Sequence, residues 1–213
     1  MTDAKLRIAA VGDLHCTRDA GGTIAKALAP VNDLADVLLL CGDLTDYGTV
    51  EEAKALAREL AVVRVPVVGV LGNHDFETGH EEDVTSILGD SGVRILDGGT
   101  FVHAHVGFAG IKGFCGGFGR GTLGHWGEPV LKRFVQEAID EELKLETALA
   151  RLHMFPTRVV VMHYAPVRAT VIGEPEEIHP FLGSSRLEEP LGRTNVAAVF
   201  HGHAHRGTPE GKT

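Results

Sequence analysis

The chain has 213 residues, of which 44% are hydrophobic and 23% charged, and its formal net charge is -9 at pH 7. This length supplies one compact domain with a sizeable core, which we expect to span residues 1–213. The acidic charge disfavours a nucleic-acid polymer as a partner, and no apolar run reaches the roughly 18 residues that a membrane span needs.

Short apolar runs alternate with helical patterns along the chain, which is typical of a layered α/β fold. The pattern predicts strands at residues 6–11, 37–41, 65–71, 93–96, 102–111, 158–162 and 197–200. It predicts helices at residues 23–32, 50–60 and 130–152. The glycine-rich stretch 113–127 has too little side-chain mass for a core segment, so we expect a loop over a site.

Five of these strands end in polar residues of metal-binding type. The residues in question are Asp13 and His15, Asp43, Asn73 to Asp75, His163, and His201 to His205. The carboxyl edge of a sheet is where sites form in α/β folds, so we expect these side chains to converge. They offer oxygen and nitrogen ligands without a thiolate, which suits Mn, Fe, Zn or Co.

Each piece is weak evidence when taken alone. An aspartate after a strand is usually a cap or turn residue, and a lone His163 is more often a core histidine than a ligand. The run from Gly202 to His205 is stronger evidence. Alternate residues of an extended segment point the same way, so His203 and His205 could reach one centre.

The order and spacing of these pieces resemble the calcineurin-like metallophosphoesterase superfamily. The five motifs of that family stand here as GDLH (12–15), GD (42–43), GNHD (72–75), His163 and GHAH (202–205). The motifs are spread over residues 12–205, so the resemblance covers nearly the whole chain. It implies an α/β fold, specifically a four-layer αββα sandwich of two mixed β-sheets flanked by helices.

The resemblance also implies the roles of the motif residues. Asp13, His15 and His205 would hold one metal ion, Asn73, His163 and His203 would hold the other, and Asp43 would bridge them. The implied cofactors are two divalent or mixed-valence metal ions, and the implied reaction is attack on phosphorus by a hydroxide held between them.

His74 is assigned no metal, and the resemblance implies that it assists the leaving group. Asp46 stands three residues after Asp43, as in the GDxxD variant of the motif, so a hydrogen bond from Asp46 would orient His74. The alternative is that Asp46 only caps the helix near residue 50. Asp75 is expected to brace the loop or a ligand histidine.

The motif details favour one branch of the superfamily. Protein serine/threonine phosphatases carry GDxxDRG and GNHE, whereas this chain has GDLTDYG (42–48) and GNHD, with Tyr47 in place of the arginine. The chain is more similar to small bacterial phosphodiesterases, so we expect a small phosphodiester substrate. A phosphomonoesterase and a non-catalytic scaffold of the same fold are the alternatives, while the HxHxDH run of metallo-β-lactamases is missing from the sequence.

Other features give weaker expectations. His201 is expected in the core or behind the ligands, and His125 on the surface of the 113–127 loop. The three cysteines form no CxxC pair and no leader pattern is visible, which indicates a cytoplasmic protein. The family resemblance implies further strands after His205, so either the C-terminal end is truncated or a second copy completes the sheet as a homodimer.

Overall fold

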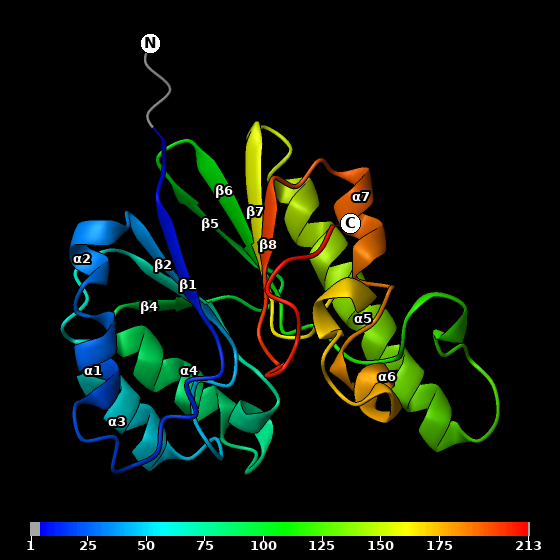
Figure 1. The fold of residues 1–213 in the computed structure, drawn as a ribbon, viewed down its shortest axis with the longest axis horizontal. Helices are drawn as coiled ribbons and strands as arrows, with labels where there is room; N and C mark the ends of the chain where they lie inside the picture. The colour runs from blue at the N-terminus through cyan, green and yellow to red at the C-terminus, as the bar shows by residue number, and fades with distance from the viewer. Residues whose placement is uncertain (1–4, 213) are drawn as a thin grey trace.

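A computed structural model describes residues 5–212 of the chain. Two four-stranded sheets lie face to face, with helices on both outer sides (Figure 1). This arrangement confirms the predicted αββα sandwich. No helix within residues 5–212 is long and apolar enough to cross a membrane.

The first sheet has the strand order β1-β2-β3-β4, and all three of its strand pairs are parallel. Of the two sheets expected to be mixed, only the second is mixed. The strands are β1 (Ile8–Val11), β2 (Val37–Cys41), β3 (Val67–Val70) and β4 (Val93–Ile95). The associated helices are α1 (Thr23–Leu28), α2 (Val31–Leu34), α3 (Val50–Leu60) and α4 (Glu81–Asp90).

Two predictions in this half need correction. The single helix expected at residues 23–32 is divided into α1 and α2, because Pro30 stands at the N-cap of α2 and cannot continue the first helix. Helix α4 was not predicted. Gly89 lies inside it and weakens the helical pattern, although three acidic residues in its first turn favour a helix start.

In the second sheet, of order β5-β6-β7-β8, β5 and β6 are antiparallel and the other pairs are parallel. The strand expected at residues 102–111 is wrong, since Ala104 has a φ of 51° and the chain turns back there. The strands are β5 (Gly99–His103), β6 (Val106–Gly110), β7 (Thr157–Val161) and β8 (Ala198–Phe200). The helices are α5 (Pro129–Arg151), α6 (His179–Leu182) and α7 (Glu188–Arg193).

The alternation of side chains along β2 explains the four layers. Val37 and Leu39 point inward and pack with Phe108 of the second sheet. Leu38 and Leu40 point outward into a separate cluster with α1, α3 and α4. An equivalent cluster joins β6 and β7 to α5 and α7. Strands buried on both faces read as continuous apolar runs, which is why they were visible in the sequence.

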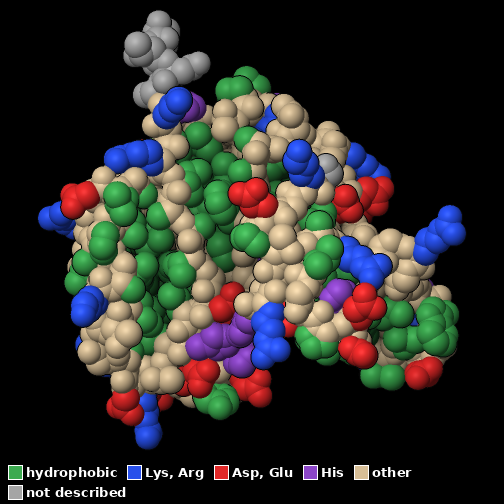
Figure 2. Space-filling model, viewed as in Figure 1, with side chains coloured by type: hydrophobic (Ala, Val, Ile, Leu, Met, Phe, Trp, Pro, Cys, Tyr) green, Lys and Arg blue, Asp and Glu red, His purple; other side chains and the backbone are tan. Residues whose placement is uncertain are grey.

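The parallel pairing brings the carboxyl ends of β1, β2 and β3 to one edge of the first sheet, and β7 and β8 end at the same edge of the second. Strands β2 and β7 contact each other across the sandwich. In the space-filling view, several histidine side chains gather in one patch beside acidic side chains (Figure 2). The fold therefore collects the polar residues that follow five strands.

Candidate metal centre

The predicted ligands form two adjacent groups. Asp13, His15 and His205 each offer a ligand atom within 4.8 Å of the others, and so do Asp43, His163 and His203. Asn73 joins the second group, because its Oδ1 lies 2.9 Å from Nε2 of His163. The structure thus brings together all seven residues that the sequence nominated, and a third group of possible ligands, His15, Asp46 and His74, overlaps the first.

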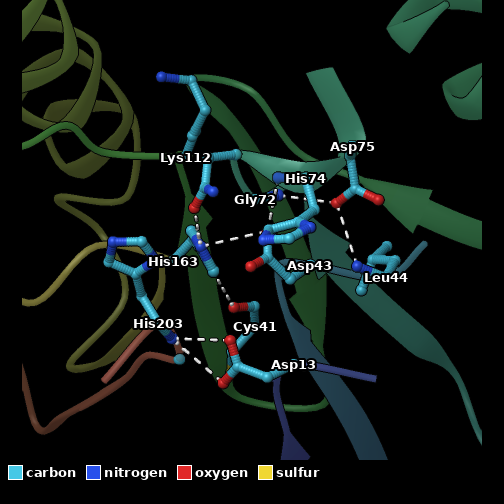
Figure 3. A network of polar contacts seen from close by, with 12 residues as sticks. Asp13, Cys41, Asp43, Leu44, Gly72, His74, Asp75, Lys112, His163 and His203 are labelled. Carbon is cyan, nitrogen blue, oxygen red and sulfur yellow. Dashed lines mark hydrogen bonds and ion pairs between the residues drawn. The ribbon is translucent and has the colours of Figure 1, made fainter. Parts of the chain in front are cut away.

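His163 is fully buried, and its two ring nitrogens have different partners. Its Nδ1 lies 3.0 Å from the main-chain carbonyl oxygen of Cys41 (Figure 3). A carbonyl only accepts, so Nδ1 carries the proton. Desolvation by burial, and the neighbouring His203, lower the pKa of His163 well below its usual value. The neutral ring therefore presents an unprotonated Nε2 to the site.

That Nε2 faces two oxygen atoms, Oδ1 of Asn73 at 2.9 Å and Oδ1 of Asp43 at 3.3 Å. An unprotonated ring nitrogen and these oxygens are all electron-pair donors, and they repel one another unless a proton or a metal cation lies among them. The amide oxygen of Asn73 and the ring nitrogen of His163 together suit a hard or borderline divalent ion. The donor set therefore fits the metal that the sequence predicted.

Asp43 reaches both groups with one carboxylate. While Oδ1 lies near His163, Oδ2 lies 3.8 Å from Nε2 of His15. That Nε2 is buried and makes no hydrogen bond within the described structure. An unpartnered buried nitrogen beside a buried carboxylate is costly without a cation. The position of Asp43 fits the bridging role.

His203 and His205 serve different groups. Nε2 of His203 lies 3.2 Å from the carbonyl oxygen of Phe181, which leaves Nδ1 free to bind a metal. Its main-chain N–H donates to the carboxylate of Asp13, and Nε2 of His205 lies 3.6 Å from Asp13. The expected extended segment is wrong: β8 has ended at Phe200, and His203 has a φ of 71°.

Backbone strain is concentrated at these ligands. Six non-glycine residues of the described chain have a positive φ. Four of them are the candidate ligands Asp13, His15, Asp43 and His203. Such conformations cost about 1–3 kcal/mol each and persist only where the surroundings enforce them, which is common at functional sites.

Glycines leave room for this crowding. A Cβ on Gly42 would overlap with the ring of His163, and one on Gly72 would overlap with the main chain and carboxylate of Asp43. The glycine that precedes the polar residue in each of these two motifs is therefore a steric requirement.

Asp75 holds two of the ligand loops together. Its buried carboxylate accepts hydrogen bonds from the main-chain N–H groups of Leu44 and Gly72 (Figure 3). It also accepts from the main-chain N–H and the hydroxyl of Thr45. These residues flank the ligands Asp43 and Asn73. The expectation that Asp75 braces the loop agrees with these contacts.

His74 and Asp46 are arranged differently from the expected pair. The ring of His74 donates from Nδ1 to the main-chain oxygen of Asp46, at 2.8 Å. The carboxylate of Asp46 instead lies 3.3 Å from Nδ1 of His15. The motif spacing placed Asp46 correctly at the site, but the sequence carries no signal for which atom faces which ring.

The pKa values of His74 and of the metal-free Asp43 carboxyl are both raised. Desolvation lowers the pKa of His74, but the hydrogen bond to Asp46 and the nearby carboxylate of Asp43 outweigh it, so the pKa is raised. Burial raises the pKa of Asp43 to about 7. His74 also donates its main-chain N–H to Asp43, at 2.9 Å.

Residues outside the motifs support the ligands. The carbonyls of Cys41 and Phe181 fix two ligand histidines, and the ring of Tyr164 lies 4.5 Å from that of His203, centroid to centroid. Main-chain carbonyls have no sequence signature, so these roles were not predictable. His201 is half-buried and its Nε2 lies 2.8 Å from the hydroxyl of Thr170, and His125 is exposed.

Comparisons with known proteins agree with this geometry. The family model described as calcineurin-like phosphoesterase matches residues 6–207, while a search of curated proteins finds no significant match. The fold is similar to the crystal structure of TT1561 of Thermus thermophilus, with a TM-score of 0.61 and 19% identity over 92% of this chain and 81% of that one. It is also similar to purple acid phosphatase PPD1 from yellow lupin (Lupinus luteus) seeds, with a TM-score of 0.58 and 12% identity over 93% of this chain and 37% of that one.

At these identities the two structures show the fold alone. The family model covers nearly the whole chain, so the chain belongs to the calcineurin-like phosphoesterase family. The family and fold make it a metal-dependent phosphoesterase, and the two ligand groups are the candidate metal site.

Proposed function

We propose that the protein is a phosphodiesterase with a dinuclear metal centre, and that His74 assists the leaving group. The observation that carries the proposal is the position of Asp43, whose two carboxylate oxygens face unprotonated or unpartnered nitrogens of two separate ligand groups. Bound there, two divalent cations supply positive charge for a phosphoryl group and lower the pKa of water.

The chain's own residues do the remaining work. His74 holds one proton on Nδ1 against the carbonyl of Asp46, and its raised pKa favours a second proton on Nε2. A protonated Nε2 can donate to a leaving alkoxide oxygen. The buried Asp75 keeps the loops that carry Asp43 and Asn73 in register.

The charge of the site supports a diester. Within residues 5–212, the ion pairs of Asp13, Asp43 and Asp46 are all with histidines, and neither lysine nor arginine pairs with them. Tyr47 stands at the motif position of the phosphate-binding arginine and is exposed. A diester carries one negative charge at neutral pH, whereas a monoester carries nearly two, so a diester needs fewer cationic side chains.

Two alternatives remain in view. A phosphomonoesterase would use the same ligands with the opposite substrate preference. A non-catalytic scaffold would need no complete ligand set, and the seven ligands and His74 favour an enzyme over it. We further propose a cytoplasmic location, which the three buried, unpaired cysteines support.

The test is hydrolysis of bis-p-nitrophenyl phosphate and p-nitrophenyl phosphate after chelation and addition of Mn²⁺, Zn²⁺, Fe²⁺ or Co²⁺. Metal-restored activity with a higher kcat/KM for the diester is expected. A higher value for the monoester supports the phosphomonoesterase, and metal binding without turnover of either compound supports the scaffold.

Variants assign the roles. Asp43→Asn should remove metal-dependent activity, whereas His153→Ala, which changes an exposed histidine in the turn after α5, should leave it unchanged. His74→Ala should retain metal and lose roughly 10²–10⁴-fold in rate, most for poor leaving groups. Equal losses for good and poor leaving groups would exclude a proton-donor role for His74.

A further inference from the structure

Asp46 contacts two site histidines through two different atoms. Its main-chain oxygen accepts from Nδ1 of His74, at 2.8 Å, and its carboxylate Oδ1 lies 3.3 Å from Nδ1 of His15. The rings of His15 and His74 are themselves in edge contact, with centroids 4.6 Å apart. The side chain and the main chain of Asp46 therefore act on different residues.

The carboxylate contact determines which nitrogen of His15 is available. A carboxylate beside Nδ1 favours the tautomer with the proton on Nδ1, which leaves Nε2 unprotonated. That Nε2 is the buried atom without a partner, and it faces Asp43. A free imidazole in water prefers the proton on Nε2, so without Asp46 the ring would protonate the atom needed for a ligand.

We propose that Asp46 is a positioning residue for His15 and acts on the metal centre through it, instead of orienting His74 with its carboxylate. A ligand histidine whose other nitrogen faces a carboxylate is a recurrent arrangement in metal sites, where it fixes the ring and raises its basicity. The inference rests on the metal centre of the proposed function but not on the identity of the substrate.

The first test uses the metal-free protein. The ¹⁵N shifts of the His15 imidazole report its tautomer at a pH where the ring is neutral. The wild type is expected to show the proton on Nδ1, and Asp46→Ala should shift it toward Nε2. The same tautomer in both proteins overturns the proposal.

The second test measures metal affinity by titration with Mn²⁺. Asp46→Asn keeps the size of the side chain and leaves the main-chain bond to His74 in place. It is expected to weaken one of two sites by roughly 10–100-fold. The dependence of the rate on the leaving group should stay as in the wild type. If Asp46→Asn binds both metal ions as tightly as the wild type, but its rate depends on the leaving group as that of His74→Ala does, then the carboxylate acts on His74 and the proposal is wrong.

Glu77→Gln is the matched control. Glu77 is exposed, and its charge also contributes to the raised pKa of His74, but it makes no ion pair with His15 in the described structure. This variant loses one negative charge near the same site and should keep both metal affinities. If it weakens the same site equally, a general charge effect replaces the proposed contact.

The two proposals fail in different ways. A wild-type protein that binds no metal contradicts both. A wild type with two metal sites and phosphoesterase activity, whose Asp46→Asn variant binds both metals equally well, contradicts only the role of Asp46. The ¹⁵N spectrum of the histidine rings also shows whether each variant remains folded, because the other histidines should keep their wild-type shifts.

Discussion

The ring of His163 donates to the main-chain carbonyl of Cys41, 122 residues away in the sequence, over 3.0 Å. His163 follows β7 of the second sheet and Cys41 ends β2 of the first, so this bond joins the two sheets at the site. The same bond sets the tautomer that exposes Nε2 to Asp43 and Asn73. Sheet packing and ligand chemistry thus depend on one side chain.

His163→Ala should therefore destabilise the metal-free protein. The substitution removes a fully buried ring and leaves the carbonyl of Cys41 without a donor, so the free energy of unfolding should fall by about 2–4 kcal/mol. Urea denaturation in the presence of chelator measures this change. His153→Ala, at an exposed position, should change it by less than about 0.5 kcal/mol.

Asp75→Asn should lower stability although it changes one atom. An amide keeps one oxygen acceptor and turns an NH₂ group toward backbone N–H donors, so two of the present hydrogen bonds are lost or become repulsive. We expect a loss of about 2–4 kcal/mol. Thr45→Val removes the hydroxyl bond to Asp75 and the bond that this hydroxyl accepts from the N–H of Gly48, and should cost about 1–2 kcal/mol, less than Asp75→Asn. Equal losses in the two variants would contradict this view of the loop.

Gly72→Ala should disrupt the site, because its Cβ would overlap with Asp43. We expect a loss of more than about 2 kcal/mol in stability and a loss of metal binding. Gly89→Ala is the matched control, since nothing lies within 4 Å of its Cβ and it stands inside helix α4. It should raise stability by about 0.5–1 kcal/mol. A tolerated Gly72→Ala would contradict the packing described here.

Metal affinity should depend on pH through Asp43. Burial raises the pKa of its carboxyl to about 7, so between about pH 4 and pH 7 the folded, metal-free protein holds a proton that the unfolded chain has lost. The contribution of Asp43 to stability therefore decreases as pH rises through this range. Metal binding must displace the proton, so affinity should fall below pH 7 by up to about tenfold per unit from this group.

Competition with a chelator between pH 5.5 and 8 measures this dependence. Asp43→Asn should show a shallower slope than the wild type. An affinity for Mn²⁺ that stays constant over the range would contradict the assignment of Asp43 as a buried ligand.

The sequence was sufficient for the strands that end in ligands, because fully buried strands such as β2 are continuous apolar runs bounded by glycine and a polar residue. It was insufficient where geometry depends on backbone conformation. Nothing in the residues around Ala104 signals the turn between β5 and β6, since alanine rarely adopts a positive φ.

At the site, too, the sequence predicted which residues take part but not how they are oriented. Residue types and spacing nominated seven candidate ligands and His74, because each supplies a chemistry that is visible in its side chain, and the structure places these residues close together. The direction of the Asp46 carboxylate and the carbonyl of Phe181 depend on how the loops fold over one another. The 178–186 segment is held near the site by main-chain bonds to two other segments. It bonds to the glycine-rich loop, from Gly117 to Gly183 and from Ser185 to Gly117, and to Ala165, which donates to Leu182 and accepts from Ser184.

Anomalous X-ray scattering from crystals grown with Mn²⁺ would locate the bound metal ions directly. We expect two peaks, one beside Asp13, His15 and His205 and one beside Asn73, His163 and His203, with Asp43 between them. A single peak would contradict the dinuclear centre, and no peak at these residues would contradict the metal site itself.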